Sequence, residues 1–360
     1  MTNNPVKGRM FRKGFLAAAA GVLFFASALV TSCEHKELWY GSDLYRYVSV
    51  VFDWSRIKED PDVSVVDMHL FYKDTLGRAP LLEQKPKAGG DLRAPYGDYR
   101  VFAYNNDTGA LLDRNADSFD TFELYTRDEN ILAPMGVSTK TDLRAKGAQD
   151  QRVVLSPEKV WSGRDTLFDV RLTDGPLVKT IVMGGATHRI VVEIAGVLNF
   201  KYLSSISCAL SGLAEGYLPG PDRITDVPVT IPFSGLKMDA KSVEAMRKAL
   251  AAGSFSPSAT GDAKDSVFGE LYYFGHCPLE PKSHWLTVYA VLTSGEKYMY
   301  TFDVTAQMHA PGAEVDGTIH ILIEDLPLPV PISDGSGMTL SMDDWDGEYI
   351  EINMGGNRKK

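Results

Sequence analysis

Histidine and cysteine are the residue types in this chain that could bind a metal or attack a substrate. The 360 residues include seven histidines, scattered without the short spacing typical of zinc sites. They are His35, His69, His188, His276, His284, His309 and His320. His276 with His284, and His309 with His320, are close enough in the chain to approach each other, but two imidazoles rarely hold zinc without a third ligand. The sequence therefore predicts ordinary strand and loop histidines and no metal site.

Two cysteines lie in the second half of the chain. Cys208 falls in a strand-like pattern, 206–210, and Cys277 falls in a turn, 275–278. Two alternatives stay open, a disulfide between them or two buried free thiols. Neither is predicted to be a nucleophile, because the adjacent His276 is the only visible partner.

The common catalytic signatures are missing from the sequence. It holds no Gly-x-Ser-x-Gly elbow, no phosphate-binding Gly-Lys-Ser/Thr loop and no His-Glu-x-x-His motif. The densest acidic cluster is 343–348, but Met342 stands where a calcium loop needs its first carboxylate. A solvated turn with Trp345 packed on the protein is the favoured interpretation. We expect no catalytic residues, no cofactor and no enzymatic activity, with a hydrolase whose carboxylates pair only in space as an alternative.

The third cysteine, Cys33, ends a segment with the features of an export signal. Residues 1–32 hold four basic residues and no acidic one, and 14–30 is an apolar run of 17 residues. The tail Leu29–Cys33 resembles the lipobox of bacterial lipoproteins, in which the cysteine and its freed amine carry lipid chains. An uncleaved membrane helix is the alternative, but the run is short for spanning. We predict a lipoprotein signal peptide over 1–32, lipidation of Cys33 and an anchor linker over 33–43.

The net charge of the chain limits the classes of partner that it can bind. The chain carries a formal net charge of −10, and removing residues 1–32 leaves 33 basic against 47 acidic residues, a net charge of −14. A body this acidic repels phosphate backbones, so we expect no nucleic-acid partner. Glu34, Glu37 and Asp43 follow the lipid cysteine, and acidic residues there resemble the surface-export signal of Bacteroidales lipoproteins. The predicted location is the outer membrane, lipid-anchored and surface-exposed.

The elements that must position any site are strands. Residues 47–54, 66–72 and 100–104 alternate apolar and polar side chains with period two, and turn clusters separate them. The second half repeats this pattern at intervals of roughly 8–12 residues, which is typical of β-sandwiches. Its predicted strands are 168–172, 189–194, 206–210, 227–232, 270–274, 285–292, 297–304 and 317–323. One helix is predicted over 240–252, capped by Asp239.

The length favours two domains, and we place their boundary near Arg164 in a polar stretch. The expected organisation is an N-terminal β-sandwich over 44–164, a C-terminal β-sandwich over 165–354 and a tail over 355–360. The predicted fold class is thus all-β, with two tandem Greek-key sandwiches of transthyretin or fimbrillin type and one short inserted helix.

Several stretches together resemble one protein family. They are Cys33–Tyr40, Val50–Trp54, Ala94–Asn105, Ile206–Leu213, Phe274–Pro278, Tyr298–Thr305, Ile323–Pro329 and Trp345. This pattern resembles a Bacteroidales lipoprotein family with a domain of unknown function, similar in build to the FimB/Mfa-type fimbrial anchor and accessory subunits. The resemblance implies two β-sandwich domains and a cell-envelope location. The family has no assigned catalytic residues, so none are carried over.

These observations together predict a structural or adhesive protein. We expect a lipid-anchored cell-envelope protein of the fimbrial accessory or anchor type, whose partners are the membrane, through its lipid, and fimbrial or other envelope proteins. The alternative is a glycan-binding surface lipoprotein that serves nutrient capture. A concave aromatic platform would favour glycan binding, and a hydrophobic groove along a sheet edge would favour subunit assembly.

Overall fold

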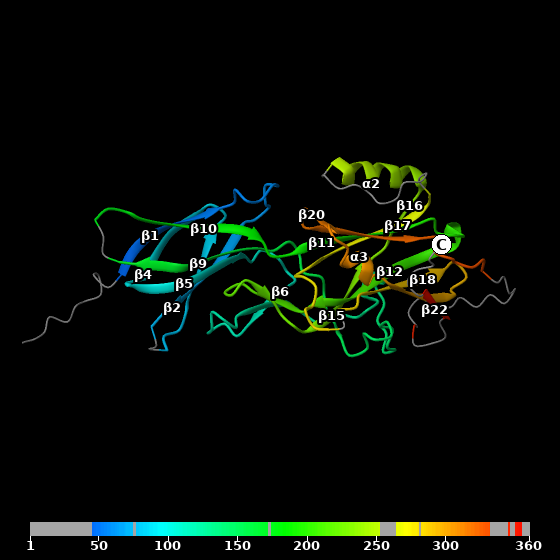
Figure 1. Cartoon of the computed structure of the whole chain (residues 1–360), viewed down its shortest axis with the longest axis horizontal. Helices are drawn as coiled ribbons and strands as arrows, with labels where there is room; N and C mark the ends of the chain where they lie inside the picture. Colours follow the sequence, from blue (N-terminus) through cyan, green and yellow to red (C-terminus); the bar gives the residue numbers. More distant parts are fainter. Residues whose placement is uncertain are drawn as a thin grey trace, which may run out of the picture. The chain divides into compact units, whose positions relative to one another are not determined.

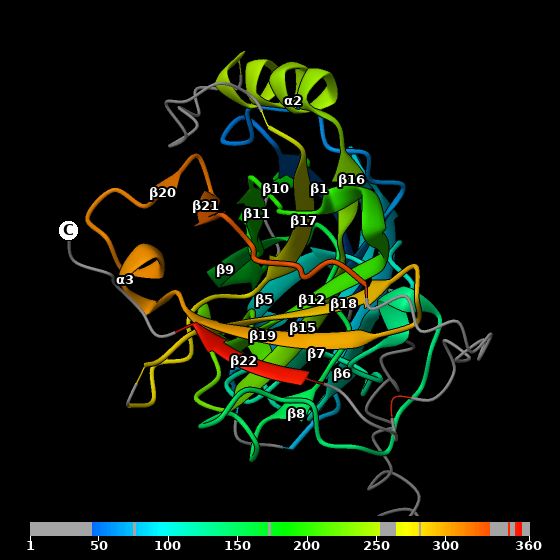
Figure 2. The same ribbon diagram turned by 90° about the vertical axis from the view of Figure 1, so that its right-hand side faces the viewer.

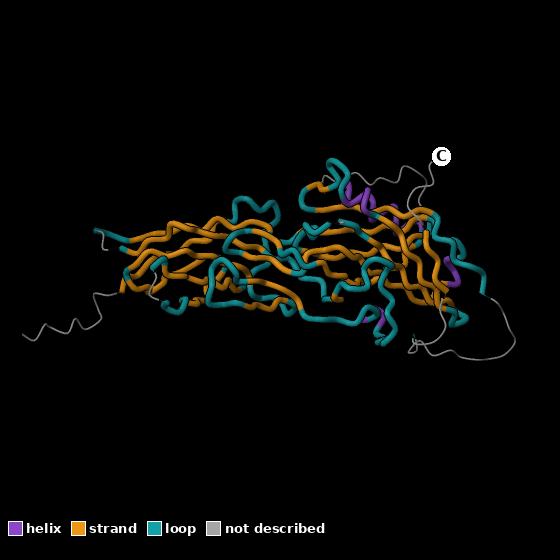
Figure 3. The backbone as a smooth tube through the Cα atoms, turned by 60° about the horizontal axis from the view of Figure 1, so that its bottom comes forward, coloured by secondary structure: helices purple, strands orange, loops and turns teal. Residues whose placement is uncertain are grey.

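The computed structural model describes residues 45–74, 77–171, 174–252, 264–280, 282–331, 345 and 350–354. Strands dominate this part of the chain (Figure 3), so the prediction of an all-β fold is confirmed. The predicted signal peptide, Cys33 and its linker, the acidic cluster apart from Trp345, and the tail 355–360 lie outside the described residues. Among the described residues, no helix is long and apolar enough to cross a membrane.

The first sheet contains seven strands in the order β3-β2-β5-β9-β10-β1-β4 (Figure 1). Their bounds are β1 Tyr45–Asp53, β2 Val65–Tyr72, β3 Leu81–Pro86, β4 Gly89–Pro95, β5 Gly97–Asn105, β9 Trp161–Val170 and β10 Leu177–Gly185. β1 and β10 run parallel, whereas β2, β5 and β9 are joined antiparallel. β3 and β4 follow each other directly in the chain yet stand at opposite ends of the strand order.

The core of this sheet comes from alternate residues of strands on both of its halves. Val48, Val50 and Phe52 of β1 are buried, as predicted from their period-two spacing, and they share one cluster with Met68 and Val101 of the other half. Burial of each such side chain contributes about 1.5–3 kcal/mol. The sheet therefore encloses its own apolar core.

A second core lies between two further sheets. The six-stranded sheet has the order β22-β19-β18-β12-β15-β8 and the five-stranded sheet the order β16-β17-β11-β21-β20 (Figure 2). The bounds in the first are β8 Arg152–Val153, β12 Leu203–Ala214, β15 Pro228–Ser234, β18 Trp285–Leu292, β19 Lys297–Asp303 and β22 Ile350–Met354. In the second they are β11 His188–Ala195, β16 Leu236–Met238, β17 Ser266–Tyr273, β20 Glu314–Val315 and β21 Thr318–Glu324. Apolar residues from both sheets form one cluster, as in a β-sandwich.

A four-stranded sheet, β14-β13-β7-β6, completes the strands. Its bounds are β6 Leu111–Arg114, β7 Glu123–Thr126, β13 Gly216–Leu218 and β14 Arg223–Ile224. Short 3₁₀ turns η1 Ala133–Met135 and η2 Phe200–Tyr202, and the one-turn helix α3 Thr305–Met308, lie between strands. Phe119 and Phe122, which precede β7, pack with Phe71 and Phe102 from β2 and β5.

The helix α2 spans Ala240–Ala252, as predicted. The backbone N–H of Ser242 donates to the Asp239 carboxylate at 2.8 Å, which is the predicted N-terminal cap. Both cartoon views place α2 against β16 and β17 (Figures 1 and 2). Val243 is fully buried there beside Phe268 of β17 and Val191 of β11.

The change from the first sheet to the later ones occurs after β10. β9 runs through Arg164, where we placed the domain boundary, and pairs with β5 on both sides of that residue. β10 then pairs in parallel with β1. Residues 162–165 are therefore part of an internal strand, which pairs with β5 on one side and with β10 on the other.

Candidate functional site

An apolar groove with a volume of about 650 Å³ follows the edge of the five-stranded sheet. The edge strand β16 contributes Leu236 and Met238, β17 contributes Phe268, and α2 contributes Met246. Pro134 of η1 lies on the lining as well. Of the charged lining residues, Arg189 and Glu270 form an ion pair with each other, and the Glu129 carboxylate accepts a hydrogen bond from the backbone N–H of Asn130 at 2.9 Å. The groove is therefore suited to apolar side chains of a partner.

A buried ion pair attaches α2, the groove wall, to the sheet below. Arg247 Nη2 of α2 lies 2.5 Å from Glu193 Oε1 of β11, and Glu193 is fully buried. His320 Nε2 of β21 lies 3.4 Å from the other carboxylate oxygen. Burial acts to raise the pKa of Glu193, but the hydrogen bonds from His320 and Arg247 outweigh it and hold that pKa below its ordinary value. Arg247 thus helps to keep the buried Glu193 side chain ionised.

Exposed apolar side chains accompany the groove at its strand edge. Leu236 is 58% exposed although it belongs to a strand, and β16 is the last strand of its sheet. An edge strand presents unpaired backbone groups to solvent, and such edges accept a further strand from another chain. The seven-stranded sheet offers a comparable residue at its own edge: Leu82 of the edge strand β3 is 57% exposed.

The C-terminal strand β22 occupies a different edge. It pairs in parallel with β19 of its own chain, and Ile352 packs against the core of the sandwich. Lys146 Nζ lies 3.8 Å from Glu351 Oε1. β22 therefore contributes to its own domain in this structure.

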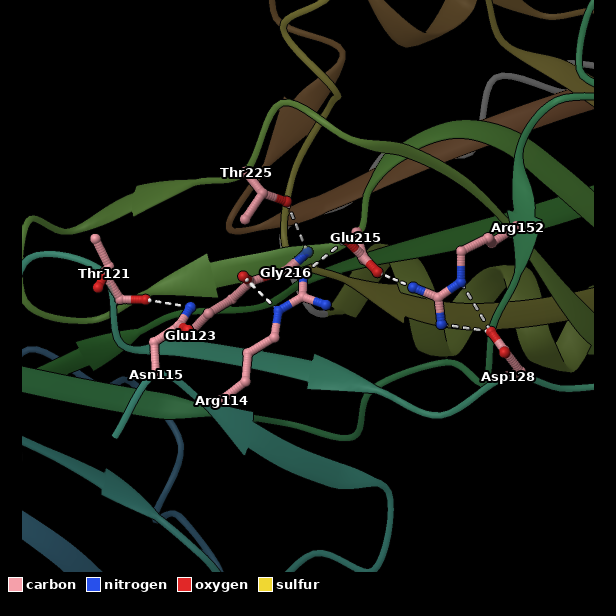
Figure 4. A network of polar contacts seen from close by, with 9 residues as sticks. All are labelled: Arg114, Asn115, Thr121, Glu123, Asp128, Arg152, Glu215, Gly216 and Thr225. Carbon is pink, nitrogen blue, oxygen red and sulfur yellow. Dashed lines mark hydrogen bonds and ion pairs between the residues drawn. The ribbon is translucent and has the colours of Figure 1, made fainter. Parts of the chain in front are cut away.

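A network of ion pairs joins the four-stranded sheet to the six-stranded sheet (Figure 4). Arg114 binds Glu123 through two hydrogen bonds of 2.6 and 2.7 Å and also reaches Glu215 at 2.9 Å. Glu215 is buried between β12 and β13 and pairs with Arg152 of β8, which also contacts Asp128. The hydrogen bond to Glu123 is the main cause that raises the pKa of Arg114. Each charged side chain of this network therefore has a partner of opposite charge.

Three of the seven histidines come together, contrary to our expectation of scattered imidazoles. Nitrogens of His276, His284 and His309 all lie within 4.8 Å of one another. Burial lowers the pKa of His276 and His284 to about 4, so both rings are neutral near pH 7. We had paired His309 with His320, but His320 binds Glu193 instead. The sequence spacing of His276, His284 and His309 gives no signal for this cluster, because the three segments that carry them come together only through the pairing of the strands.

The two cysteines of the second half are free thiols in the structure, and both are buried. Burial raises the pKa of Cys208 to about 12 and also raises that of Cys277. Neither is poised as a nucleophile. Trp345 is buried and packs edge-on against Tyr289 at a centroid distance of 5.9 Å.

Comparison with known proteins gives a family and one curated relative. The model of the family described as a domain of unknown function (DUF5119) matches residues 32–234, more than half of the chain. The protein called "Putative fimbrium anchoring subunit Fim4B" of Bacteroides ovatus is 22% identical over 222 residues. That match covers 60% of this chain and 58% of the relative, so the chain spans less than two thirds of the relative's length.

One solved structure shares the fold with a TM-score above 0.5. A protein from Bacteroides ovatus described as "a putative adhesin" matches with a TM-score of 0.53 at 17% identity, covering 79% of this chain and 94% of that one. "The fimbrial anchor protein Mfa2" from Porphyromonas gingivalis matches with a TM-score of 0.44 at 13% identity, covering 78% and 90%. The first of these similarities places the chain among β-rich folds of this architecture.

Proposed function

The chain belongs to the family described as a domain of unknown function (DUF5119), and we propose that it is a fimbrial-type anchor or accessory subunit. In this proposal the protein is attached to the outer membrane by a lipid on Cys33 and binds another envelope protein through the groove beside β16. It has a structural or adhesive role and no enzymatic activity. The observation that carries the proposal is the match over 222 residues to the protein called "Putative fimbrium anchoring subunit Fim4B".

The family match supports the expected processing of the N-terminus. It begins at residue 32, directly before Cys33, and leaves the basic and apolar signal segment outside. This is where a mature lipoprotein of the predicted kind would begin. Lipid anchoring would then place the sandwiches at the cell surface without any membrane-spanning element of their own.

The chemistry of the groove supports a protein partner more than a glycan. Sugar rings stack on exposed aromatic faces, whereas Phe233 and Phe268 of the groove are both 4% exposed. Leu236, Met238 and Met246 instead offer flexible aliphatic contacts next to an open strand edge. An added strand would hydrogen-bond along β16 and place alternate apolar side chains in the groove.

The proposal includes a division of the chain into two domains. We infer two sandwich domains, with the first extending through β10 to Gly185, because β9 and β10 pair with the N-terminal strands.

Nothing in the ion-pair network or the groove favours a hydrolase, since the buried carboxylates Glu193, Glu123 and Glu215 are all bound to arginine.

The test is to purify the protein from detergent-extracted membranes of the native bacterium and to identify what remains bound. The proposal predicts fimbrial shaft subunits, recovered in defined ratio with the protein. A polysaccharide transport complex in their place would support the glycan-binding alternative and overturn the proposal. Recovery from Cys33→Ala cells, where the protein should leave the membrane fraction, separates anchoring from partner binding.

A further inference from the structure

The three clustered imidazoles lie close enough together to hold one metal ion. His276 Nδ1 lies 3.2 Å from His284 Nε2, and His309 Nε2 lies 3.1 Å from the same atom. Zinc–nitrogen bonds of about 2.05 Å at tetrahedral angles separate the ligand nitrogens by about 3.3 Å. These two separations are within about 0.2 Å of that value, and the nitrogens of His276 and His309 lie within 4.8 Å of each other.

Hydrogen bonding assigns the protons of the central ring. His284 Nδ1 lies 3.0 Å from the carbonyl oxygen of Ser211. A carbonyl only accepts, so His284 Nδ1 must donate, and in the neutral ring Nε2 then carries the lone pair. This lone pair points toward the other two imidazoles. A metal-binding histidine is commonly fixed in this way, with its far nitrogen donating to a backbone carbonyl.

The hydrogen bonds of the cluster do not fix which of the two outer rings donates to His284 Nε2. His276 Nδ1 and His309 Nε2 both approach the single lone pair on His284 Nε2, which serves one donor well and two poorly. His276 has another partner for its proton, because its Nε2 lies 3.3 Å from the hydroxyl of Tyr273. His309 Nε2 also lies 3.3 Å from the carbonyl of Lys282. His309 is exposed, so its Nδ1 can carry the proton in solvent and release Nε2 to a cation.

Contacts with the backbone hold the central ligand, His284, in place. The N–H of His284 donates to Thr305 Oγ1 at 2.9 Å, and the N–H of Val304 donates to the carbonyl of His284 at 3.0 Å. Gly212 has a φ of 80°, and a Cβ there would lie 2.8 Å from His284 Nδ1, so only glycine lets the ring approach Ser211. The site is thus built before any ligand binds.

We propose that His276, His284 and His309 bind one divalent d-block cation, with Zn²⁺ as the best match, and leave one coordination position open to water. Three imidazoles without a carboxylate suit zinc, copper or nickel and do not suit calcium or magnesium. His284 is fully buried and His309 is exposed, which gives the cation a path from solvent. The cation would connect the loop after β17, the start of β18 and the end of α3.

The test uses the full-length protein in detergent, without a polyhistidine tag and after treatment with a chelator. Titration with Zn²⁺ by calorimetry, and with Co²⁺ by visible absorption, should give one site per chain and tetrahedral cobalt bands. Zn²⁺ should also raise the melting temperature. His309→Ala should weaken Zn²⁺ binding at least about tenfold and abolish the cobalt bands, while its metal-free melting temperature stays that of the wild type.

The matched control is His188→Ala, which removes a histidine paired with Glu314 outside the cluster. This variant should bind Zn²⁺ like the wild type. The proposal is overturned if the wild type shows no saturable one-to-one binding, or if His309→Ala binds Zn²⁺ as tightly as His188→Ala does.

Discussion

Removing the guanidinium that holds α2 against the sheet should lower stability in a pH-dependent way. In Arg247→Met the stem of the side chain is largely kept, but Glu193 loses its partner while fully buried. A buried carboxylate without a partner becomes protonated instead of remaining charged. At pH 7, protonating a group whose ordinary pKa is 4.5 costs about 3.4 kcal/mol, which is the upper limit of the charge effect. Because His320 still contacts Glu193, we expect a loss of about 2–3 kcal/mol.

The sign of the pH dependence follows from the lowered pKa of Glu193. A depressed carboxyl pKa contributes stability that is complete above the unfolded value of 4.5 and is lost as the pH falls through the folded value. In Arg247→Met the folded-state pKa of Glu193 is raised instead, so the cost of protonating this group falls from about 3.4 kcal/mol at pH 7 to about 0.7 kcal/mol at pH 5, and the difference between the two proteins should shrink accordingly. Urea denaturation followed by circular dichroism at both pH values measures it.

Two controls isolate the ion pair. Lys248→Met removes a neighbouring cation of α2 whose pairing with Glu244 is solvent-exposed, and it should cost less than about 0.5 kcal/mol. The double variant Glu193→Gln with Arg247→Met removes both charges and should recover most of the loss. If Arg247→Met costs no more than Lys248→Met, or costs equally at both pH values, the assignment of Glu193 as a dependent carboxylate is refuted.

Three further predictions concern single residues outside α2. Cys33→Ala should leave a longer precursor that no longer partitions into detergent; an unchanged mature mass with membrane attachment would contradict lipidation. Cys208 and Cys277 should react slowly with a thiol reagent in native protein and promptly after denaturation, whereas fast native labelling, or none after denaturation, would show reactive or bridged thiols. Burial lowers the pKa of His69 from 6.5 to about 4, so the wild type should lose up to about 3.4 kcal/mol of stability as the pH falls from 6.5 to 4. In urea titrations His69→Leu should lack this loss. Parallel pH profiles of the two proteins would contradict the prediction.

The strands with a clear period of two could be predicted from the sequence, some of them to the residue. Trp285–Leu292 is β18 as predicted, and α2 follows from Asp239 and its apolar face. β3 and β4 were missed because they hold few apolar residues among charged, polar and glycine residues. We expected half-buried strands, yet Phe102 is buried on the outer face of β5 because Phe119 and Phe122 cover it. A later loop decides that burial, and a local pattern cannot show it.

The candidate sites depended more strongly on long-range pairing. The groove combines β15, β16, β17 and α2, and no single segment among them carries a signal for it. The histidine trio needs Leu213 bridged to His276, and it needs His284, directly before β18, to lie beside both Thr305 at the start of α3 and His309 directly after α3. Lipidation of Cys33, by contrast, is predicted from a local sequence pattern, and it remains a prediction.

The most direct test of the proposed partner-binding role compares two matched leucines. Leu236→Asp places a charge in the groove at β16, and Leu82→Asp places one at β3, where the leucine is almost equally exposed, at 57% against 58%. Both variants should fold, because neither leucine is buried. Binding of purified fimbrial shaft subunit to each variant and to the wild type is then measured in detergent. We predict that Leu236→Asp loses binding while Leu82→Asp keeps it; equal binding by all three proteins would contradict the proposed groove.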